Sequence, residues 1–117
     1  MSQTVLIVDD HLEFRRSARS LLEDDGFVVV GEARDGHEAV RLADRLRPMI
    51  VLLDIQLPDL DGFEVAERLA MSEAPPAVVL ISSRSAASFG PRLDEAAALG
   101  FIPKSRLSGA ALTALVG

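Results

Sequence analysis

The sequence of 117 residues contains no cysteine, no tryptophan and no tyrosine. Without cysteine the chain can form neither a disulfide framework nor a thiolate metal site. The absence of cysteine also fits a reducing environment, and we expect a cytoplasmic location.

Positive charge and long hydrophobic runs are also scarce. The chain has 12 basic and 18 acidic residues, a formal net charge of -6, which argues against nucleic-acid binding by this segment. No apolar run approaches membrane-spanning length, and the N-terminus lacks the pattern of a signal peptide, so we expect no membrane association. A chain of this length is expected to form one domain, residues 1–117.

Short apolar runs alternate with segments of helical periodicity. The runs predict strands buried on both faces, and the alternation predicts a parallel sheet with helices on both of its faces. Strands are expected at residues 4–8, 27–31, 50–54, 77–81 and 100–103. Helices are expected at residues 12–24, between Asp35 and Pro48, from Asp61 to Ala70, and at residues 91–99 and 108–116.

Local signals refine these boundaries. Asp35 and Asp61 are predicted helix N-caps, with Glu38 and Glu64 three residues on as capping-box partners. The dipeptide at positions 90 and 91 is Gly-Pro, which breaks a helix. We therefore expect the fourth helix to begin late and the segment Arg84–Gly90 to be mobile or irregular.

Acidic residues follow two of the predicted strands. Asp9 and Asp10 follow the first strand and Asp54 ends the third, while Lys104 follows the fifth. In parallel sheets these positions meet at one edge, where ligands bind. Three carboxylates against one ammonium leave two negative charges, which suits Mg²⁺. Asp10 and Asp54 are expected as direct ligands, Asp9 as a direct or water-bridged ligand, and the backbone carbonyl of Gln56 as a further ligand.

The same arrangement makes Asp54 a candidate nucleophile toward phosphorus, with the metal ion and Lys104 holding the phosphoryl oxygens. Ser82, at the end of the fourth strand, offers a hydroxyl that only the phosphorylated form would use. Taken singly, these residues have simpler interpretations. Asp9 and Asp10 could cap the following helix, Lys104 could be a solvated lysine, and Phe101 could be an ordinary core aromatic residue.

These residues together resemble the receiver domain of a two-component response regulator. The matching positions are Asp9, Asp10, Asp54, Pro58, Asp61, Gly62, Ser82 and Lys104. The segments Val8–His11, Gly31–Ala33 and Gly100–Ser105 resemble the NarL/LuxR-type subfamily. The resemblance implies a flavodoxin-like (βα)5 three-layer sandwich whose sheet order is 2-1-3-4-5. One departure is at Lys104, which is followed by serine where receivers often have proline.

By this resemblance the protein is a signalling switch in a phosphorelay and not an enzyme. Asp54 would accept a phosphoryl group from a sensor histidine kinase or a phosphotransfer protein. Ser82 and Phe101 would be the switch pair that alters the face formed by the fourth helix, fifth strand and fifth helix. The subfamily implies transcription regulation through a C-terminal DNA-binding domain absent from this sequence, and homodimerisation on phosphorylation is possible in such a system.

Three other functions can be compared with the sequence by the residues that each of them needs. An aspartate-nucleophile phosphohydrolase needs an acid two residues after the nucleophile, but Gln56 is there. Flavin binding needs a phosphate-binding loop after the first strand, where Asp9 and Asp10 would repel phosphate, and the chain lacks tryptophan and tyrosine for stacking. A receiver-like interaction module that is not regulated by phosphorylation is the remaining alternative.

Overall fold

Five parallel strands form the centre of the structure, a computed structural model in which residues 2–117 are described. They are β1 (Thr4–Val8), β2 (Val28–Ala33), β3 (Ile50–Asp54), β4 (Ala77–Ser82) and β5 (Gly100–Pro103). Their order across the sheet is β2-β1-β3-β4-β5 and every pairing is parallel, which confirms the predicted fold class and strand order. β2 ends two residues later than predicted because Glu32 and Ala33 still pair with β1.

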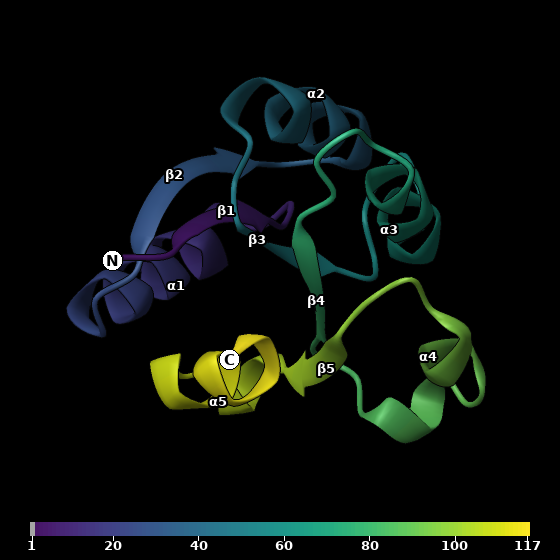
Figure 1. Ribbon diagram of the computed structural model, residues 1–117. Helices are drawn as coiled ribbons and strands as arrows, with labels where there is room; N and C mark the ends of the chain where they lie inside the picture. The colour runs from purple at the N-terminus through teal and green to yellow at the C-terminus, as the bar shows by residue number, and fades with distance from the viewer. Residues whose placement is uncertain (1) are drawn as a thin grey trace.

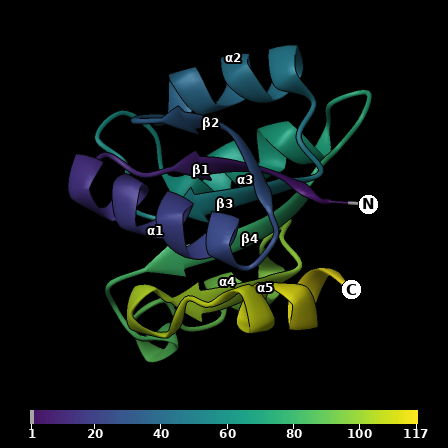
Figure 2. The ribbon, with the colours of Figure 1, turned by 90° about the vertical axis from the view of Figure 1, so that its left-hand side faces the viewer.

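Helices cover both faces of this sheet (Figure 1). On one face lie α1 (Leu12–Asp24) and α5 (Gly109–Val116), which are in front of the sheet in Figure 2. The other face is covered by α2 (Gly36–Leu46), α3 (Gly62–Ala70) and α4 (Arg92–Glu95). Each face has its own apolar cluster, so the strands contribute alternate residues to the two clusters and read as continuous apolar runs. Within residues 2–117 no helix has both the length and the apolar character needed to cross a membrane.

Both predicted N-caps form, but neither capping box is complete. The Asp35 side chain accepts a hydrogen bond of 2.8 Å from the N–H of Glu38, whose own carboxylate accepts from the N–H one residue before the cap. Asp61 caps α3 as predicted. The prediction for Glu64 was wrong, because its carboxylate pairs with Arg68 one turn later, at 2.7 Å.

The fourth helix is shorter than predicted. We expected residues 91–99, but α4 covers only Arg92–Glu95, and Ala96 is already extended with ψ 147°. Shortly afterwards the N–H of Leu99 bonds to the carbonyl of Val78 at 2.8 Å, which begins the pairing with β4. A helix advances only about 1.5 Å per residue, so an extended segment is needed to reach the sheet in so few residues.

The segment before α4 is irregular, as predicted. It contains one short 3-10 helix, η1 (Ala86–Ser88), followed by a turn in which Gly90 has a φ of 58°. This left-handed conformation is open to glycine at little steric cost. The predicted mobility of Arg84–Gly90 stays a prediction.

Gly62 allows the start of α3 to pack directly against the end of β3. A Cβ atom at this position would lie 2.6 Å from the Asp54 carbonyl oxygen and 2.6 Å from the Ile55 Cα, both of which are backbone atoms. The N–H of Gly62 also bonds to the Ile55 carbonyl at 2.8 Å. The loop that follows Asp54 is therefore closed by a residue without a side chain.

We expect Gly62→Ala to lower the free energy of unfolding by about 1–3 kcal/mol, because overpacking against backbone cannot be relieved by a rotamer change. Urea titration followed by far-UV circular dichroism measures this difference. Gly31→Ala is the control, since its Cβ would meet only the terminal methyl carbons of Leu46 and Leu6, at 2.9 and 3.3 Å, which can move. Equal losses in the two variants would contradict the argument.

Candidate functional site

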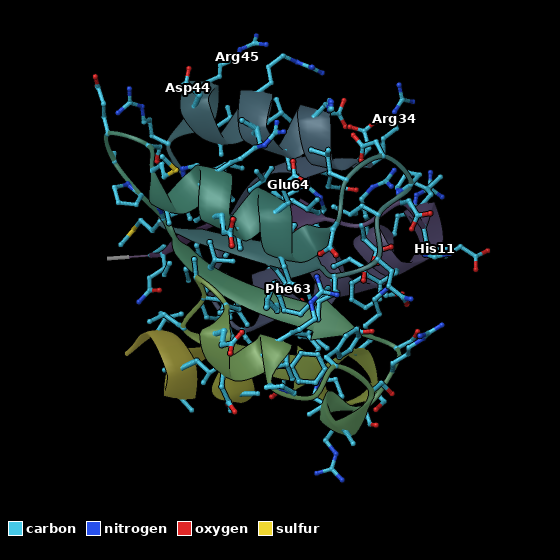
Figure 3. All side chains as sticks on the ribbon, turned by 90° about the vertical axis from the view of Figure 1, so that its right-hand side faces the viewer. His11, Arg34, Asp44, Arg45, Phe63 and Glu64 are labelled. Carbon is cyan, nitrogen blue, oxygen red and sulfur yellow. The ribbon has the colours of Figure 1, made fainter. Side chains whose placement is uncertain are left out.

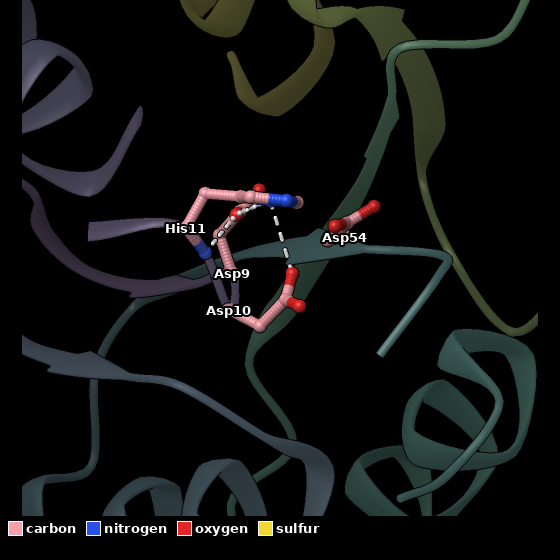
Figure 4. A group of neighbouring side chains, drawn as sticks. All are labelled: Asp9, Asp10, His11 and Asp54. Atoms are coloured by element: carbon pink, nitrogen blue, oxygen red, sulfur yellow. Dashed lines mark hydrogen bonds and ion pairs between the residues drawn. The ribbon is translucent and has the colours of Figure 1, made fainter. Parts of the chain in front are cut away.

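Polar residues gather where the strands end. Asp9 follows β1, Asp54 ends β3, Ser82 ends β4 and Lys104 follows β5. Asp9 and Ser82 are 0% exposed and Asp54 is 3% exposed, although each is polar. Figure 4 shows Asp9 and Asp10 beside Asp54 at this edge of the sheet. The structure thus brings together the carboxylates that the sequence placed on separate strands.

Lys104 lies between two of these carboxylates. Its Nζ is 2.5 Å from Asp9 Oδ2 and 3.3 Å from Asp54 Oδ2, and it lies 4.6 Å from the centre of the Phe14 ring. Burial alone would lower the pKa of Lys104, but its close contact with the Asp9 carboxylate and the charges of both carboxylates outweigh it and raise that pKa. Lys104 therefore stays a cation across the ordinary pH range and balances the buried acids.

Asp54 is difficult to ionise in this position. Burial raises its pKa to about 6, the N–H of Gln56 and the charge of Lys104 oppose the rise, and the nearby Asp9 charge adds to it. The Gln56 N–H donates to Asp54 Oδ1 at 3.1 Å and fixes the orientation of the carboxylate. The carboxylate is therefore held by directed contacts but lacks sufficient positive charge around it.

The donor set fits a magnesium ion. Asp9 Oδ2 is fully buried and forms no hydrogen bond of acceptable geometry, although the Lys104 ammonium group is close. Ligand atoms of Asp9, Asp10, His11 and Asp54 all lie within 4.8 Å of one another. Carboxylate oxygens of this kind are the ligands that Mg²⁺ prefers, and an incomplete cage suits an ion that keeps several waters. The role of the Gln56 carbonyl as a ligand stays a prediction.

His11 borders the carboxylates. Its side chain is 69% exposed, as expected for a surface residue that adjoins the site. Its Nδ1 lies 3.1 Å from Asp9 Oδ1 and 3.0 Å from Asp10 Oδ1. Figure 3 shows His11 at the end of the molecule where the strands stop.

The two predicted switch residues lie on neighbouring strands. The Oγ of Ser82 accepts a hydrogen bond of 3.0 Å from the N–H of Arg84, which leaves its hydroxyl proton available for another acceptor. Phe101 is half-buried against the cluster beneath α2 and α3, with its ring centre 6.1 Å from that of Phe89. Phe101 therefore packs against the apolar cluster, and its role in the switch pair stays a prediction.

A pair of arginines supports the backbone of the site from α1. Arg15 donates to the Asp9 carbonyl at 2.7 Å and to Glu32 at 3.0 Å, and Arg19 donates to the other oxygen of Glu32 at 2.7 Å. Burial would raise the pKa of Glu32, but the bonds from Arg19 and Arg15 outweigh it and hold that pKa below its usual range. This support could not be predicted from the sequence, because nothing in the local pattern of β2 identifies the partners of Glu32.

Arg92 of α4 joins the irregular segment to the loop after β3. Its guanidinium group lies 4.2 Å from the centre of the Phe63 ring and 2.7 Å from Asp61 Oδ2. The Phe63 ring in turn lies 6.0 Å from the Phe89 ring, which contacts Phe101. Figure 3 shows Phe63 between α3 and the α4 segment. These contacts hold the short α4 against the loop that carries Gln56, since Asp61 also bridges to Gln56.

We expect Arg92→Ala to increase amide hydrogen exchange in residues 86–95, because its ion pair and cation–π contact each contribute about 1 kcal/mol or less at an exposed site. Mass spectrometry of exchanged peptides measures this. Arg68→Ala is the matched control, since it removes the same charge from an exposed pair within one helix. Unchanged exchange in Arg92→Ala would show that the contact does not restrain this segment.

Comparison with known proteins agrees with this geometry. Residues 5–116 match the family model described as "Response regulator receiver domain". A Pseudomonas aeruginosa protein named "Positive alginate biosynthesis regulatory protein" is 44% identical over 102 residues, which cover 86% of this chain and 40% of that protein. BvgA of Bordetella pertussis, named as a positive transcription regulator of virulence factors, is 38% identical over 104 residues, 89% of this chain and 50% of that protein. The chain therefore spans about half the length, or less, of these relatives.

A solved structure leads to the same family. The LuxR-family two-component response regulator of Aurantimonas sp. SI85-9A1 superposes with a TM-score of 0.85 at 30% sequence identity, covering 97% of this chain and 81% of that one. The strand order, the acids at the strand ends and the match across nearly the whole chain are consistent with each other. The protein belongs to the response regulator receiver domain family, with relatives among NarL/LuxR-type regulators.

Proposed function

We propose that this chain is a phosphorylation-activated switch in which Asp54 accepts a phosphoryl group from a phosphohistidine of a sensor kinase or phosphotransfer protein. One observation carries the proposal. The Asp54 carboxylate ends a central strand at the site edge, with the Lys104 ammonium group 3.3 Å away and the buried Asp9 beside it. This is the charge arrangement that transfer of a phosphoryl group to a carboxylate requires.

The transfer step balances without a co-reactant. An Asp54 carboxylate oxygen forms a bond to phosphorus as the bond between phosphorus and the donor imidazole nitrogen breaks. The electron pair of the broken bond stays on that nitrogen, which leaves as a histidine side chain. Lys104 can hold a phosphoryl oxygen while remaining bonded to Asp9, because its ammonium group carries three donors. A magnesium ion held by Asp9, Asp10 and Asp54 would offset the negative charge that spreads over the phosphoryl oxygens.

Ser82 would then respond to phosphorylation by forming a new hydrogen bond. Its hydroxyl proton has no acceptor among the hydrogen bonds of residues 2–117, and a phosphoryl oxygen supplies one. Movement of Ser82 would pull on the N–H of Arg84 and on the segment that leads to Phe89, against which Phe101 packs. The face formed by α4, β5 and α5 would change shape as a result.

The process that the switch controls is proposed from the names of the relatives. Because regulators of transcription are among them and the chain spans about half their length, we propose that the switch controls transcription through a C-terminal DNA-binding domain. Phosphorylation-dependent pairing of two copies is the accompanying expectation. Size-exclusion chromatography with and without beryllofluoride, a phosphoryl mimic, tests that pairing.

The central experiment is incubation with magnesium and acetyl phosphate. Intact mass and Phos-tag electrophoresis should detect one added phosphoryl group in the wild-type protein and none in Asp54→Asn. Asp44→Asn is the control, because Asp44 is an exposed acid on α2 outside the site. An adduct that persists in Asp54→Asn would overturn the assignment of the acceptor.

An interaction module that is never phosphorylated is the second candidate. The observation in its favour is the reduction of α4 to Arg92–Glu95, within the face that should carry the signal. Amide chemical shifts measured with and without beryllofluoride distinguish the two functions. Coupled shifts at Ser82, Phe101 and α5 support the switch, and shifts confined to the neighbours of Asp54 support the interaction module.

A further inference from the structure

The main-chain carbonyl of Asp9 has a side chain as its hydrogen-bond partner. The N–H of Asp9 donates to the Ala33 carbonyl at 2.9 Å, and β2 ends at Ala33. In a parallel ladder the N–H and C=O groups of one residue bond to different residues of the neighbouring strand, so the Asp9 carbonyl would need a residue beyond the end of β2. Arg15 of α1 takes that place and donates to the carbonyl at 2.7 Å.

The Arg15 side chain is itself held in a fixed orientation. It is only 14% exposed, and its Nε donates to Glu32 Oε1 at 3.0 Å. Its main-chain N–H bonds to the His11 carbonyl at 3.1 Å, in the first turn of α1. Because the guanidinium group is planar and rigid, the bond to Glu32 also fixes the direction in which its other nitrogens point.

The bonded carbonyl lies in the chain between two acids of the site. It belongs to the planar peptide unit that joins Asp9 to Asp10, so the orientation of this unit sets where both side chains begin. Asp9 is fully buried beside Lys104, the Asp10 side chain is 35% exposed, and Figure 4 shows both beside Asp54. Loss of the bond from Arg15 would let this peptide unit rotate and would move both carboxylates.

We propose that Arg15 is a positioning residue of the metal-binding and phosphoryl-transfer site, which acts through the Asp9 carbonyl and is oriented by Glu32. The inference rests on the proposed function and adds a residue of α1 to it. Within residues 2–117 the hydrogen bonds and ion pairs of the Arg15 side chain are those with Glu32 and the Asp9 carbonyl, and none reaches a carboxylate of the site. The effect of Arg15 on the site is therefore transmitted by the main chain.

Arg19 provides a comparison within the same network. It lies one turn further along α1 and donates to Glu32 Oε2 at 2.7 Å, so it shares this acid with Arg15. Its bond to the Val29 carbonyl, at 3.4 Å, lies toward the other end of β2. Both arginines connect α1 to β2, but only Arg15 continues to Asp9.

Calorimetric titration with Mg²⁺ tests the positioning role without any phosphoryl transfer. Arg15→Met should weaken Mg²⁺ binding by about tenfold, the loss typical when a residue that orients a metal ligand is removed. Arg19→Met should weaken it much less, because Arg15 keeps its bonds to Asp9 and Glu32. Arg15→Lys retains a donor for the carbonyl and should restore part of the affinity, which also keeps the test valid if Arg15→Met does not fold.

Two further measurements separate positioning from a merely structural role. With acetyl phosphate, Arg15→Met should need more Mg²⁺ to reach half of its maximal rate of phosphorylation, but should approach the wild-type rate when Mg²⁺ is saturating. The ¹⁵N chemical shift of the Asp10 amide should change in Arg15→Met and not in Arg19→Met, because a hydrogen bond to a carbonyl polarises the N–H of the same peptide unit.

Equal Mg²⁺ affinities in the wild-type protein and Arg15→Met, or equal losses in the two methionine variants, would overturn the positioning role and leave Arg15 as a link between α1 and β2 only. A wild-type protein that binds Mg²⁺ but accepts no phosphoryl group would instead remove the proposed function, and the Mg²⁺ affinities would still decide the role of Arg15. Absence of Mg²⁺ binding in the wild-type protein would overturn both proposals.

Discussion

At pH 7.5, Asp54→Asn is expected to be more stable than the wild-type protein by up to about 3 kcal/mol, although it should accept no phosphoryl group. The gain arises because burial raises the pKa of Asp54 from 3.8 to about 6, so ionising it in the folded state is unfavourable. Asparagine fills the same volume without the charge. A carboxylate that destabilises its own fold is the trade-off expected if Asp54 is the proposed phosphoryl acceptor.

The sign of the pH dependence follows from proton binding. Between pH 3.8 and about 6 the folded state binds more protons at Asp54 than the unfolded state does. Stability from this group is therefore fully present below pH 3.8 and is lost as the pH rises through about 6. Asp54→Asn lacks this loss, so the difference between the two proteins should be small near pH 4 and complete above pH 7.

Urea titrations across this pH range measure the difference. Asp59→Asn is the control with the opposite sign. Burial would raise the pKa of Asp59, but hydrogen bonds from the N–H groups of His37, Gly36 and Leu60 outweigh it and lower that pKa. Asp59→Asn should therefore destabilise the protein above about pH 4 and lose its effect in acid. A wild-type protein as stable as Asp54→Asn at every pH would show that the buried carboxylate is not strained.

Lys104→Met should be destabilised by about 3–5 kcal/mol at pH 7.5, because it leaves the charge of the fully buried Asp9 without its partner. Methionine retains much of the apolar stem, so the loss reports the charge more than the packing. The pKa of Lys104 is raised, so its contribution is fully present at neutral pH and is lost only above its ordinary pKa. Lys104 itself therefore gives the wild-type protein no pH dependence of stability below neutrality.

Two conditions should restore stability to Lys104→Met. Acid should reduce the loss by protonating Asp54, whose pKa is raised, and Mg²⁺ should reduce it by replacing the missing positive charge. Urea midpoints at pH 5 and pH 7.5, with and without magnesium, measure both effects. Arg106→Met is the matched control, since Arg106 is an exposed cation two residues further along the chain. Equal midpoints for the two variants would mean that Lys104 does not balance the buried acids.

The two predictions describe one electrostatic balance. Removing the acid at Asp54 stabilises the fold and removing the base at Lys104 destabilises it, because the site has an excess of negative charge when no cation is bound. In the proposed function, the pKa of Asp54 would set the lower limit of the pH range in which its carboxylate can act as a nucleophile, and a bound cation would lower that limit.

The sequence by itself determined the elements and the residues at their ends. Apolar runs placed all five strands to within two residues, and a 3.6-residue period placed α1 at its observed bounds of Leu12–Asp24. These patterns can be told apart because a strand buried on both faces is a continuous apolar run, whereas a helix buried on one face has apolar residues that recur about every 3.6 positions. The chain order of strand-end residues then identified Asp9, Asp54, Ser82 and Lys104 as neighbours, since parallel strands end at one edge.

Only the tertiary structure decided what those residues touch. The length of α4 depends on where β5 must join β4, and the Arg92 contact depends on where α4 then lies. The Asp59 carboxylate accepts a hydrogen bond from the N–H of Gly36, at the start of α2 and 23 residues away in the sequence. No local signal could reveal this contact. The contacts of His11 Nδ1 with Asp9 and Asp10 likewise depend on how the chain bends after β1. Local periodicity encodes which residues are buried, whereas distances between side chains are set by how the layers pack.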